Sequence, residues 1–397
     1  MARLRASNLP FIFAGLVLAG GCSAPATGPS WSAAPAVATA VPAVPLPPRP
    51  VTIVPPPAAP VSRPWPFKRL YEVDYVDVQV IADRFRLKAS WVTSGRVMQL
   101  ADASGRVRLR FENRDRSFYF EGIRVFMGET TVSSQGSLYV SRIDVIKTIV
   151  PLVQPADYAG QLPASPRLIV LDAGHGGADP GTRNLALHLE EKNLTLDVVL
   201  RLKKLLERRG YQVILTRSDD TKLAPAQRTD LEERDAVANR AKADLFLSVH
   251  FNSALATVTG TETYVMTPQF QASSGGARDA AVDKAFPGNR QDFANIVLGY
   301  HLHRSLLAGL NSADRGFKRS RYMVLEFPDC PAALVEAAYL SNNTDASRLA
   351  TPEFRQKVAQ ALADGIDEYS AALAALHPSA SATAEPRPAP AAPQPHP

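Results

Sequence analysis

The chain has 397 residues, 46% of them apolar and 21% charged, so it can form two or three globular domains with a substantial core. The net charge of +6 is modest and favours an anionic environment such as a cell envelope. The chain has no arginine and lysine stripe interleaved with aromatic residues, which argues against nucleic-acid binding. The two cysteines, Cys22 and Cys330, exclude a disulfide framework and a CxxC metal site.

The first 22 residues have the layout of an export signal. Two arginines lie within residues 1–5, an apolar run covers residues 9–18, and small residues lead to Cys22. The apolar run is too short for a permanent membrane-spanning helix. The sequence LAGGCS resembles the lipobox of bacterial lipoproteins, which implies a lipid anchor on Cys22, although Ala19 stands where a larger aliphatic residue is usual. Ordinary signal cleavage is the alternative, and either route predicts an exported protein of the periplasm or cell envelope.

Three other segments have the composition of connectors. Residues 23–66 are rich in Pro, Ala and Val and almost uncharged, which predicts a disordered, extended tether. Residues 155–166 form a predicted linker, and residues 377–397 a disordered Pro/Ala-rich tail. We therefore expect two folded regions between these connectors.

The first folded region, residues 67–154, is here called the accessory region. Its short alternating apolar runs predict a small β-rich or α+β domain. We expect strands within 106–112, 117–127 and 130–140 and short helices within 76–86 and 141–150. This arrangement loosely resembles the repeat at the amino end of copper amine oxidases. The region contains neither histidine nor cysteine, so we expect a substrate-positioning or purely structural role and no metal site.

The second folded region, residues 167–376, is here called the main region, and its first stretch is RLIVLDAGHGGADPG. The apolar run at 168–171 predicts a strand buried on both faces of a sheet. The glycines that follow allow a tight turn beside His175, which places this histidine at the carboxyl end of a buried strand, where open α/β sheets bind ligands. The loop lacks the third glycine of GxGxxG, so no nucleotide cofactor is expected.

Strands and helices alternate through the rest of the main region. This pattern predicts an α/β fold with a mostly parallel sheet flanked by helices. We expect helices at 190–209, 231–241, 292–310 and 352–372, and strands at 211–216, 243–252, 261–266, 321–326 and 333–337.

Polar residues at the ends of predicted strands are candidates for a functional site. His250 follows the apolar run LFLSV, and Glu336 ends PAALVE, where a carboxylate is costly unless it is paired, metal-bound or protonated. Glu190 or Glu191 opens the helix after the His175 loop, and physics alone does not choose between them. Two imidazoles and one carboxylate with an open fourth position make a hydrolytic zinc site. Each residue alone also has a structural explanation, as a core histidine, an ion-pair partner or a helix N-terminal acid.

Five motifs in the main region together resemble a known family. In chain order they are DAGHGGADPG, EEKNLTLDVVLRLKKLLERRGYQVILTR, ADLFLSVHFNSA, ADRGFK and PAALVEAAYLSNNTDA. They are similar to the zinc N-acetylmuramoyl-L-alanine amidases of bacterial cell-wall turnover, the amidase-3 group. The resemblance covers residues 167–376 and implies a phosphorylase/hydrolase-like zinc amidase fold.

The resemblance also implies a role for each candidate. His175, Glu191 and His250 would be the zinc ligands, with Glu191 chosen over Glu190 because the family's glutamate precedes a lysine. Glu336 would be the catalytic glutamate, which accepts the proton of zinc-activated water and delivers it to the departing amine. The implied reaction is hydrolysis of the amide between N-acetylmuramic acid and L-alanine, in peptidoglycan or a muramyl peptide. Some relatives carry an inhibitory helix after the second histidine strand, but residues 268–291 are short and rich in small residues.

Other polar residues have more open interpretations. Asn252 is a candidate for oxyanion stabilisation, and Arg315 and Lys318 either contact muropeptide carboxylates or are simply solvated. Glu326, at the end of a predicted strand, is a reserve candidate for the base. His301 and His303 do not share a helix face, so they are expected in packing roles.

Two alternative functions are a catalytically silent peptidoglycan-binding protein on the same fold and a zinc peptidase that cuts the stem peptide. For all three functions we expect a monomer.

Overall fold

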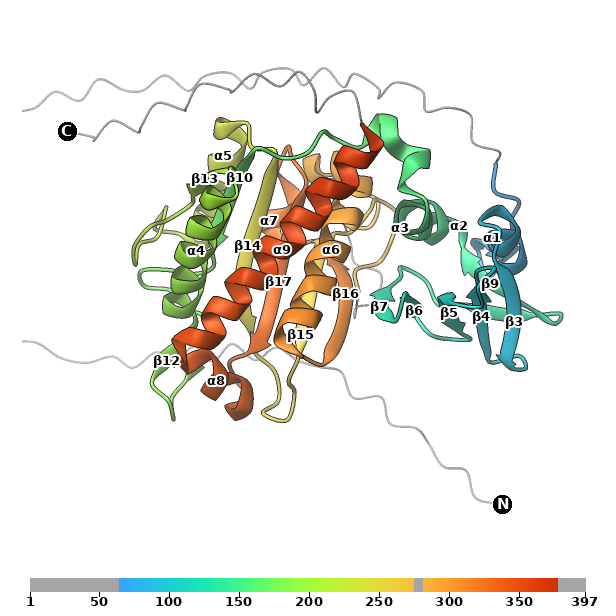
Figure 1. Ribbon diagram of the computed structural model, residues 1–397, viewed down its shortest axis with the longest axis horizontal. Helices are drawn as coiled ribbons and strands as arrows, with labels where there is room; N and C mark the ends of the chain where they lie inside the picture. Colours follow the sequence, from blue (N-terminus) through green and yellow to red (C-terminus); the bar gives the residue numbers. More distant parts are fainter. Residues whose placement is uncertain (1–63, 275–280, 378–397) are drawn as a thin grey trace, which may run out of the picture. The chain divides into compact units, whose positions relative to one another are not determined.

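The computed structural model describes residues 64–274 and 281–377 (Figure 1). The predicted export signal, Cys22, almost all of the predicted tether and residues 378–397 lie outside the described residues. None of the helices in the described part has the length and apolar character needed to cross a membrane.

The accessory region consists of short antiparallel strands with a few helical turns. Its strands are β1 (Lys68–Leu70), β2 (Val73–Asp77), β3 (Lys88–Thr93), β4 (Val97–Ala101), β5 (Val107–Glu112), β6 (Ser117–Phe120), β7 (Ile123–Phe126), β8 (Val132–Ser134) and β9 (Ser137–Ser141). Its helices are α1 (Val78–Arg84), α2 (Arg142–Asp144), η1 (Val145–Ile149) and α3 (Val150–Val153). Strands β1, β2, β9 and β8 form one sheet, and β3 to β7 form a meander that belongs to a larger sheet. Trp65, inside the predicted tether, is already buried and packs against Phe85.

The main region alternates strands with longer helices. Its strands are β10 (Leu168–Ala173), β11 (Arg183–Asn184), β12 (Leu189–Glu190), β13 (Gln212–Leu215), β14 (Leu245–Asn252), β15 (Thr261–Met266), β16 (Asp314–Ser320) and β17 (Ala332–Tyr339). Its helices are α4 (Glu191–Arg208), α5 (Gln227–Ala241), η3 (Pro287–Gln291), α6 (Asp292–Leu310), α7 (Met323–Glu326), α8 (Asn343–Ala350) and α9 (Pro352–Leu376). Between the two regions, the predicted linker contains a 3₁₀ helix, η2 (Pro155–Gln161).

The large sheet is mixed, in the order β13-β10-β14-β17-β15-β16-β7-β6-β5-β4-β3. Strands β13, β10, β14 and β17 pair in parallel, but β15 runs antiparallel to β17. All pairs from β7 to β3 are antiparallel as well. The predicted α/β fold with flanking helices is therefore present, whereas the sheet is mixed and not mostly parallel.

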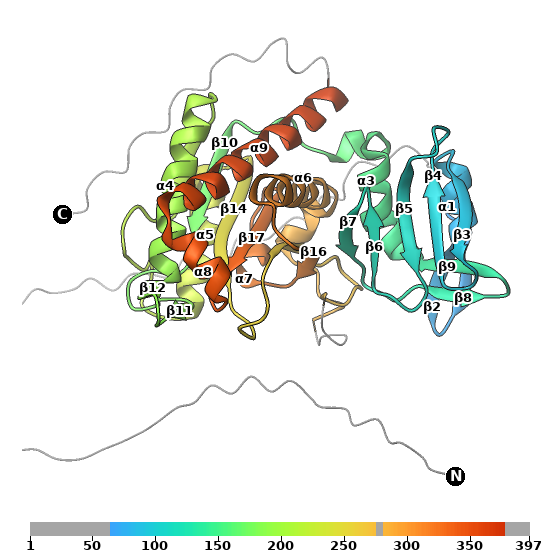
Figure 2. The same ribbon diagram turned by 60° about the horizontal axis from the view of Figure 1, so that its bottom comes forward.

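Helices cover the two faces of the sheet in the main region (Figure 2). Helices α4, α6 and α9 pack on one face through apolar residues such as Val198, Leu302 and Leu362, against Val249 and Val335 of the strands. Helices α5 and α7 cover part of the other face in a second, smaller cluster. All six residues of β10 are buried, as expected for a strand in the middle of a layered α/β fold.

One predicted strand is wrong. Residues 321–326 include the short helix α7, and the strand lies earlier, at β16. β16 has the sequence DRGFKRS, whose polar side chains hid it from an apolar pattern. These polar side chains have partners inside the fold, since Asp314 bonds His303 and Arg319 bonds Asp144.

The accessory and main regions share backbone and core contacts. Strand β7 pairs with β16 in parallel at Val125 and Phe317. Asp144 of the accessory region is fully buried and accepts hydrogen bonds from Arg319 (2.9 Å) and Gln271 (2.8 Å) of the main region. It also accepts the backbone N–H groups of Gly128 and Glu129. One buried carboxylate therefore joins both regions.

We expect Asp144→Ala to lower the free energy of unfolding by about 3–5 kcal/mol, because it leaves the buried Arg319 guanidinium without its charge partner. Urea unfolding followed by circular dichroism measures this. Asp74→Ala is the matched control, since Asp74 pairs with the exposed Arg69 and its removal should cost less than about 1 kcal/mol. Equal effects of the two substitutions would contradict the role of Asp144.

Candidate metal centre and active site

His175 lies two residues after the end of β10, in a loop with unusual backbone conformation. Its φ is +63°, and Gly176 and Gly177 that follow also have positive φ. The His175 carbonyl accepts a hydrogen bond of 2.8 Å from Arg234 Nη2. The left-handed conformation, rarely adopted by a histidine, is therefore held by a specific side-chain contact.

Arg234 is itself fixed beneath the loop by buried carboxylates. Its Nη1 lies 2.7 Å from Asp172 of β10 and its Nε lies 3.0 Å from Asp230. Burial opposes ionisation of Asp172, but the charge of Arg234 and hydrogen bonds from Ser248 and Thr216 keep its pKa below the usual value. Because a buried ion pair of this kind is stable only with both partners present, Asp172 and Asp230 keep Arg234 in place beneath the His175 loop.

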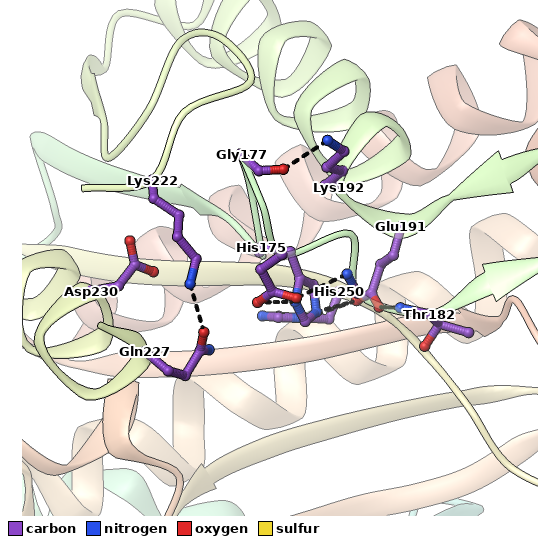
Figure 3. A network of polar contacts seen from close by, with 12 residues as sticks. His175, Gly177, Thr182, Glu191, Lys192, Lys222, Gln227, Asp230 and His250 are labelled. Atoms are coloured by element: carbon purple, nitrogen blue, oxygen red, sulfur yellow. Dashed lines mark hydrogen bonds and ion pairs between the residues drawn. The ribbon is translucent and has the colours of Figure 1, made fainter. Parts of the chain in front are cut away.

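Glu191 is the first residue of α4 and is 3% exposed. Its Oε1 lies 3.1 Å from His175 Nε2 and 2.9 Å from His250 Nδ1, and Figure 3 shows the three side chains directed at one another. The backbone N–H of Thr182 donates to Oε2 (2.8 Å) and that of Phe251 to Oε1 (3.0 Å). The short excursion between β10 and α4 thus returns the carboxylate to the histidine loop.

The side chains of His175, Glu191 and His250 form a group that could hold a metal ion. One possible ligand atom from each residue lies within 4.8 Å of the other two, and no second group of this kind occurs among residues 64–274 and 281–377. The two imidazole centroids are 4.9 Å apart with an interplanar angle of 81°. His175 Nδ1 lies 2.9 Å from Asp179 Oδ2, a contact that orients the ring and directs Nε2 into the group.

Two glycines leave room for these side chains. A Cβ on Gly174 would lie 2.3 Å from His250 Cε1, and a Cβ on Gly181 would lie 2.6 Å from both Glu191 Oε2 and His175 Cδ2. The glycine-rich motif therefore does more than turn the chain. It allows backbone to pass directly against the three clustered side chains.

The charges in the group are strongly coupled. Burial alone would lower the pKa of His175, but hydrogen bonds and charge from Glu191 and Asp179 raise it to about 9. Burial would raise the pKa of Glu191, yet both imidazoles keep it well below its usual value. Without a bound cation, the buried carboxylate therefore holds a proton on a neighbouring histidine.

Glu336 lies on the strand next to His250. The two residues are paired in register between β17 and β14, so their side chains share one face of the sheet. Glu336 Oε2 is buried and has no hydrogen-bond partner in the described part of the chain. Burial, together with the charges of Glu191 and Glu262, raises the pKa of Glu336 well above its usual value. A carboxyl group with these properties can exchange a proton with a bound molecule.

Residues 169–368, about half of the chain, match the family model Amidase_3, described as N-acetylmuramoyl-L-alanine amidase. The chain belongs to this family. As an enzyme of the family it is a peptidoglycan hydrolase that cleaves the amide bond between N-acetylmuramic acid and L-alanine.

Several proteins are similar to this amidase. An uncharacterized protein of Bacillus subtilis (strain 168), YqiI, is 33% identical over 222 residues, which are 56% of this chain and 91% of that protein. The N-acetylmuramoyl-L-alanine amidase LytC of the same strain is 33% identical over 202 residues, 51% of this chain and 35% of LytC. The catalytic domain of CwlV from Bacillus (Paenibacillus) polymyxa var. colistinus is 31% identical, with a TM-score of 0.42, over 51% of this chain and 97% of that domain.

Glu190 and Glu191, the two candidates at the start of helix α4, have different partners. Glu190 of the amidase forms ion pairs with Arg183 (3.1 Å) and Lys192 (3.8 Å), away from the imidazoles. Glu326, the reserve candidate for the base, ends helix α7 and not a strand, and it does not belong to the group of His175, Glu191 and His250.

The amidase also contains a buried carboxylate that the sequence did not reveal. Glu262 of β15 is 2% exposed and is paired in register with Glu336 across β17. Burial would raise its pKa, but Lys318 and the hydroxyls of Tyr264 and Tyr339 keep that pKa below its usual value. The sequence signal was an acidic residue in the strand TETYVM, which is buried at every position.

The predicted substrate-contact residues of the amidase meet at Glu262. Asn252 Nδ2 lies 3.0 Å from Glu262 Oε2, Arg315 Nε lies 3.3 Å from Oε1, and Lys318 also bonds Oε1. Contact with substrate stays a prediction for all three.

The two histidines of helix α6, His301 and His303, form hydrogen bonds with other side chains of the amidase. His303 is fully buried and bonds Thr263 and Asp314, while His301 bonds Glu368. Both are consistent with the packing roles expected for them.

We expect Gly181→Ala to abolish tight metal binding, because its Cβ would displace the Glu191 carboxylate. Zn²⁺ content after dialysis, measured by atomic absorption, tests this. Gly210→Ala is the matched control, since Gly210 has a φ of +90° but nothing lies within 4 Å of its Cβ position. That control should lose stability through backbone strain and keep its metal. Full metal content in Gly181→Ala would contradict the crowding argument.

Proposed function

We propose that the amidase holds a zinc ion through His175, Glu191 and His250, and that Glu336 moves the proton in amide hydrolysis. The observation that carries this proposal is the convergence of three ligand atoms within 4.8 Å, beside a glutamate paired in register with one of them. Two imidazoles and one carboxylate are the donor set of hydrolytic zinc sites. Zinc in such a site supplies Lewis-acid chemistry, which acidifies water and polarises the scissile carbonyl.

The residues around Glu191 fit a cation better than they fit a proton alone. Glu191 Oε1 faces two ring nitrogens and the N–H of Phe251 at the same time, so positive charge is required at this point. Asp179 fixes the ring of His175, and Thr182 fixes the second oxygen of Glu191. This outer layer of hydrogen bonds is typical of metal ligands.

Glu336 has the properties expected of a group that both accepts and donates a proton. Its pKa is raised by burial and by Glu191 and Glu262, and its Oε2 has no partner in the described chain. In the proposed reaction it takes a proton from the attacking water and returns it to the amino group of L-alanine as the C–N bond breaks. That amino group is a poor leaving group without a proton, so the same carboxyl serves both steps.

Several features of the rest of the chain belong to the same proposal. We propose export through residues 1–22, a lipid anchor at Cys22, and residence in the periplasm or cell envelope, where peptidoglycan lies. We also propose a catalytic domain over residues 167–376, an accessory region with a substrate-positioning or purely structural role, and a monomer. These assignments rest on the sequence.

Digestion of purified sacculi tests the reaction itself. We expect peptides that begin with L-alanine and sugar chains without peptide, and we expect a chelator to stop their release. Mass analysis identifies the products. Cuts within the stem peptide would instead indicate a peptidase, and intact sacculi would indicate a silent peptidoglycan-binding protein.

Substitution separates the metal ligands from the proton carrier. We expect Glu336→Gln to retain zinc but to lose about 10²–10⁴-fold in kcat, the usual contribution of a positioned acid and base. His175→Ala should lose both zinc and activity, because it removes a ligand. Zinc content and the rate of amide cleavage are measured on the same preparations. Wild-type activity in Glu336→Gln would remove its proposed role.

Zinc affinity should depend on pH through His175. This group has a pKa of about 9 in the metal-free protein and must lose its proton to bind a cation. Affinity is therefore highest above about pH 9 and falls as the pH drops, by up to about tenfold per pH unit for this one group. Competition with a chelating dye between about pH 6 and pH 9 measures the slope.

Asp179→Asn is the matched variant for this measurement. It removes one of the two carboxylates that raise the pKa of His175, so the dependence should shift to lower pH. An affinity that does not change with pH in the wild type would contradict the assignment of His175 as a protonated ligand.

A further inference from the structure

Five side chains from the four strands β14, β15, β16 and β17 donate hydrogen bonds to Glu262. The carboxylate is 2% exposed and therefore depends on them for solvation. Its Oε1 accepts from Tyr339 Oη (2.6 Å), Arg315 Nε (3.3 Å) and Lys318 Nζ, and its Oε2 accepts from Tyr264 Oη (2.5 Å) and Asn252 Nδ2 (3.0 Å). Two of these donors carry positive charge, so the cluster has an excess of one positive charge over the single carboxylate.

This cluster lies directly beside the proposed proton carrier. Glu262, Glu336 and His250 occupy one row across β15, β17 and β14, since Glu336 is paired in register with both neighbours. Side chains in such a row lie about 5 Å apart at Cβ. The cations fixed by Glu262 are therefore neighbours of the scissile bond in any complex that places this bond at Glu336.

Arg315 has unused hydrogen-bonding capacity on its outer side. Its side chain is 38% exposed, and only Nε contacts Glu262 and Tyr339. The two outer guanidinium nitrogens make no hydrogen bond to any residue that the structure describes. Lys318, which is 16% exposed, contributes a second charge from the same strand. A guanidinium fixed at one nitrogen and open at the other two is suited to bind a carboxylate.

The strand that carries both cations is held from each side. β16 pairs with β15 through Tyr264 and Lys318, and with β7 of the accessory region through Phe317 and Val125. The ring of Phe126 lies 5.4 Å from Lys318 Nζ. A Cβ on Gly316, between the two cations, would lie 2.4 Å from the same ring. The positions of the charges are therefore set by packing as well as by Glu262.

We propose that Glu262 is a positioning residue that fixes Arg315 and Lys318 as a carboxylate-binding wall for the peptide part of the substrate. This inference rests on the proposed function, because it places the stem peptide at Glu336. The wall selects substrates whose stem peptide carries a free carboxylate near the scissile amide. Glu262 itself does not touch the reacting atoms.

Two versions of one substrate test the proposal with zinc-loaded full-length protein. The first is a muramoyl peptide with its stem carboxylates free, and the second is the same peptide with these carboxylates converted to primary amides. For the wild type we expect a KM about tenfold lower for the acidic peptide, which is the discrimination expected from one charge pair at the edge of a site. The kcat values should agree within about threefold, because the wall binds without taking part in the chemistry.

The variants Arg315→Gln, Lys318→Gln and Glu262→Gln should remove this discrimination. Each should raise KM for the acidic peptide about tenfold and change KM for the amidated peptide less than about twofold. Arg315→Lys should restore part of the preference, because it retains the charge. Arg290→Gln is the matched control, since Arg290 pairs with Asp329 at an exposed site, and it should behave like the wild type. Zinc content should be unchanged in every variant.

The outcomes separate this inference from the proposed function. If the wild type cleaves both peptides with equal KM, the wall does not bind a carboxylate and the inference fails. If Glu262→Gln raises KM equally for both peptides or lowers zinc content, Glu262 is merely structural and the inference fails as well. If the wild type cleaves neither peptide between the muramoyl group and L-alanine, the proposed function fails first.

Discussion

The Glu191 carboxylate is the group on which the rest of the site depends. It is almost completely buried at the start of α4, and its Oε1 faces two imidazole nitrogens and a backbone N–H. A carboxylate in this position is stable only if positive charge is supplied next to it. The loop of His175, the glycines that make room and the buried Arg234 beneath them all serve to bring imidazoles to this one oxygen. A divalent cation would satisfy the requirement more completely than a single proton, because it would neutralise the carboxylate and bind both rings.

Three ionised glutamates close to one another would repel, but the surroundings of the three carboxyl groups differ. Glu191 is neutralised by histidines, Glu262 is neutralised by Lys318 and Arg315, and Glu336 between them has a free oxygen and a raised pKa. Of the three, Glu336 is the one whose surroundings favour the protonated carboxyl group, as a group that gains and loses a proton in a reaction requires. The mixed sheet makes this arrangement possible. β15 runs antiparallel to β17, so the start of β15 lies beside the second half of β17. Glu262, the second residue of β15, is therefore level with Glu336 of β17 and His250 of β14.

Apolar runs in the sequence predicted strand ends and a helix start in the site. The sequence did not reveal charged residues whose partners lie on other strands. The buried run before His175, the run before His250 and the periodic helix after Glu191 identify strand ends and a helix start, so these residues could be placed at one edge of a sheet. Glu262 could not be placed, because a single acid within TETYVM looks like the solvent side of an edge strand until its donors are known. β16 was missed for the same reason. Its charges are satisfied by Glu262, His303 and Asp144, which lie far away in the sequence.

The accessory region belongs to this argument because β16 lies between it and the site. One edge of β16 pairs with β15, which carries Glu262, and the other edge contacts β7 at Val125. Arg319, one residue beyond Lys318, forms an ion pair with Asp144 of the accessory region. Lys318 forms an ion pair with Glu262 of the main region. Neighbouring side chains of β16 are therefore held by different regions. Arg315, Lys318 and Arg319 lie within five consecutive residues of β16, so Asp144 bonds the same short strand that carries the two cations beside Glu262. The accessory region is therefore part of the packing that fixes the position of β16, through the pairing of Val125 with Phe317 and through the ion pair of Asp144 with Arg319.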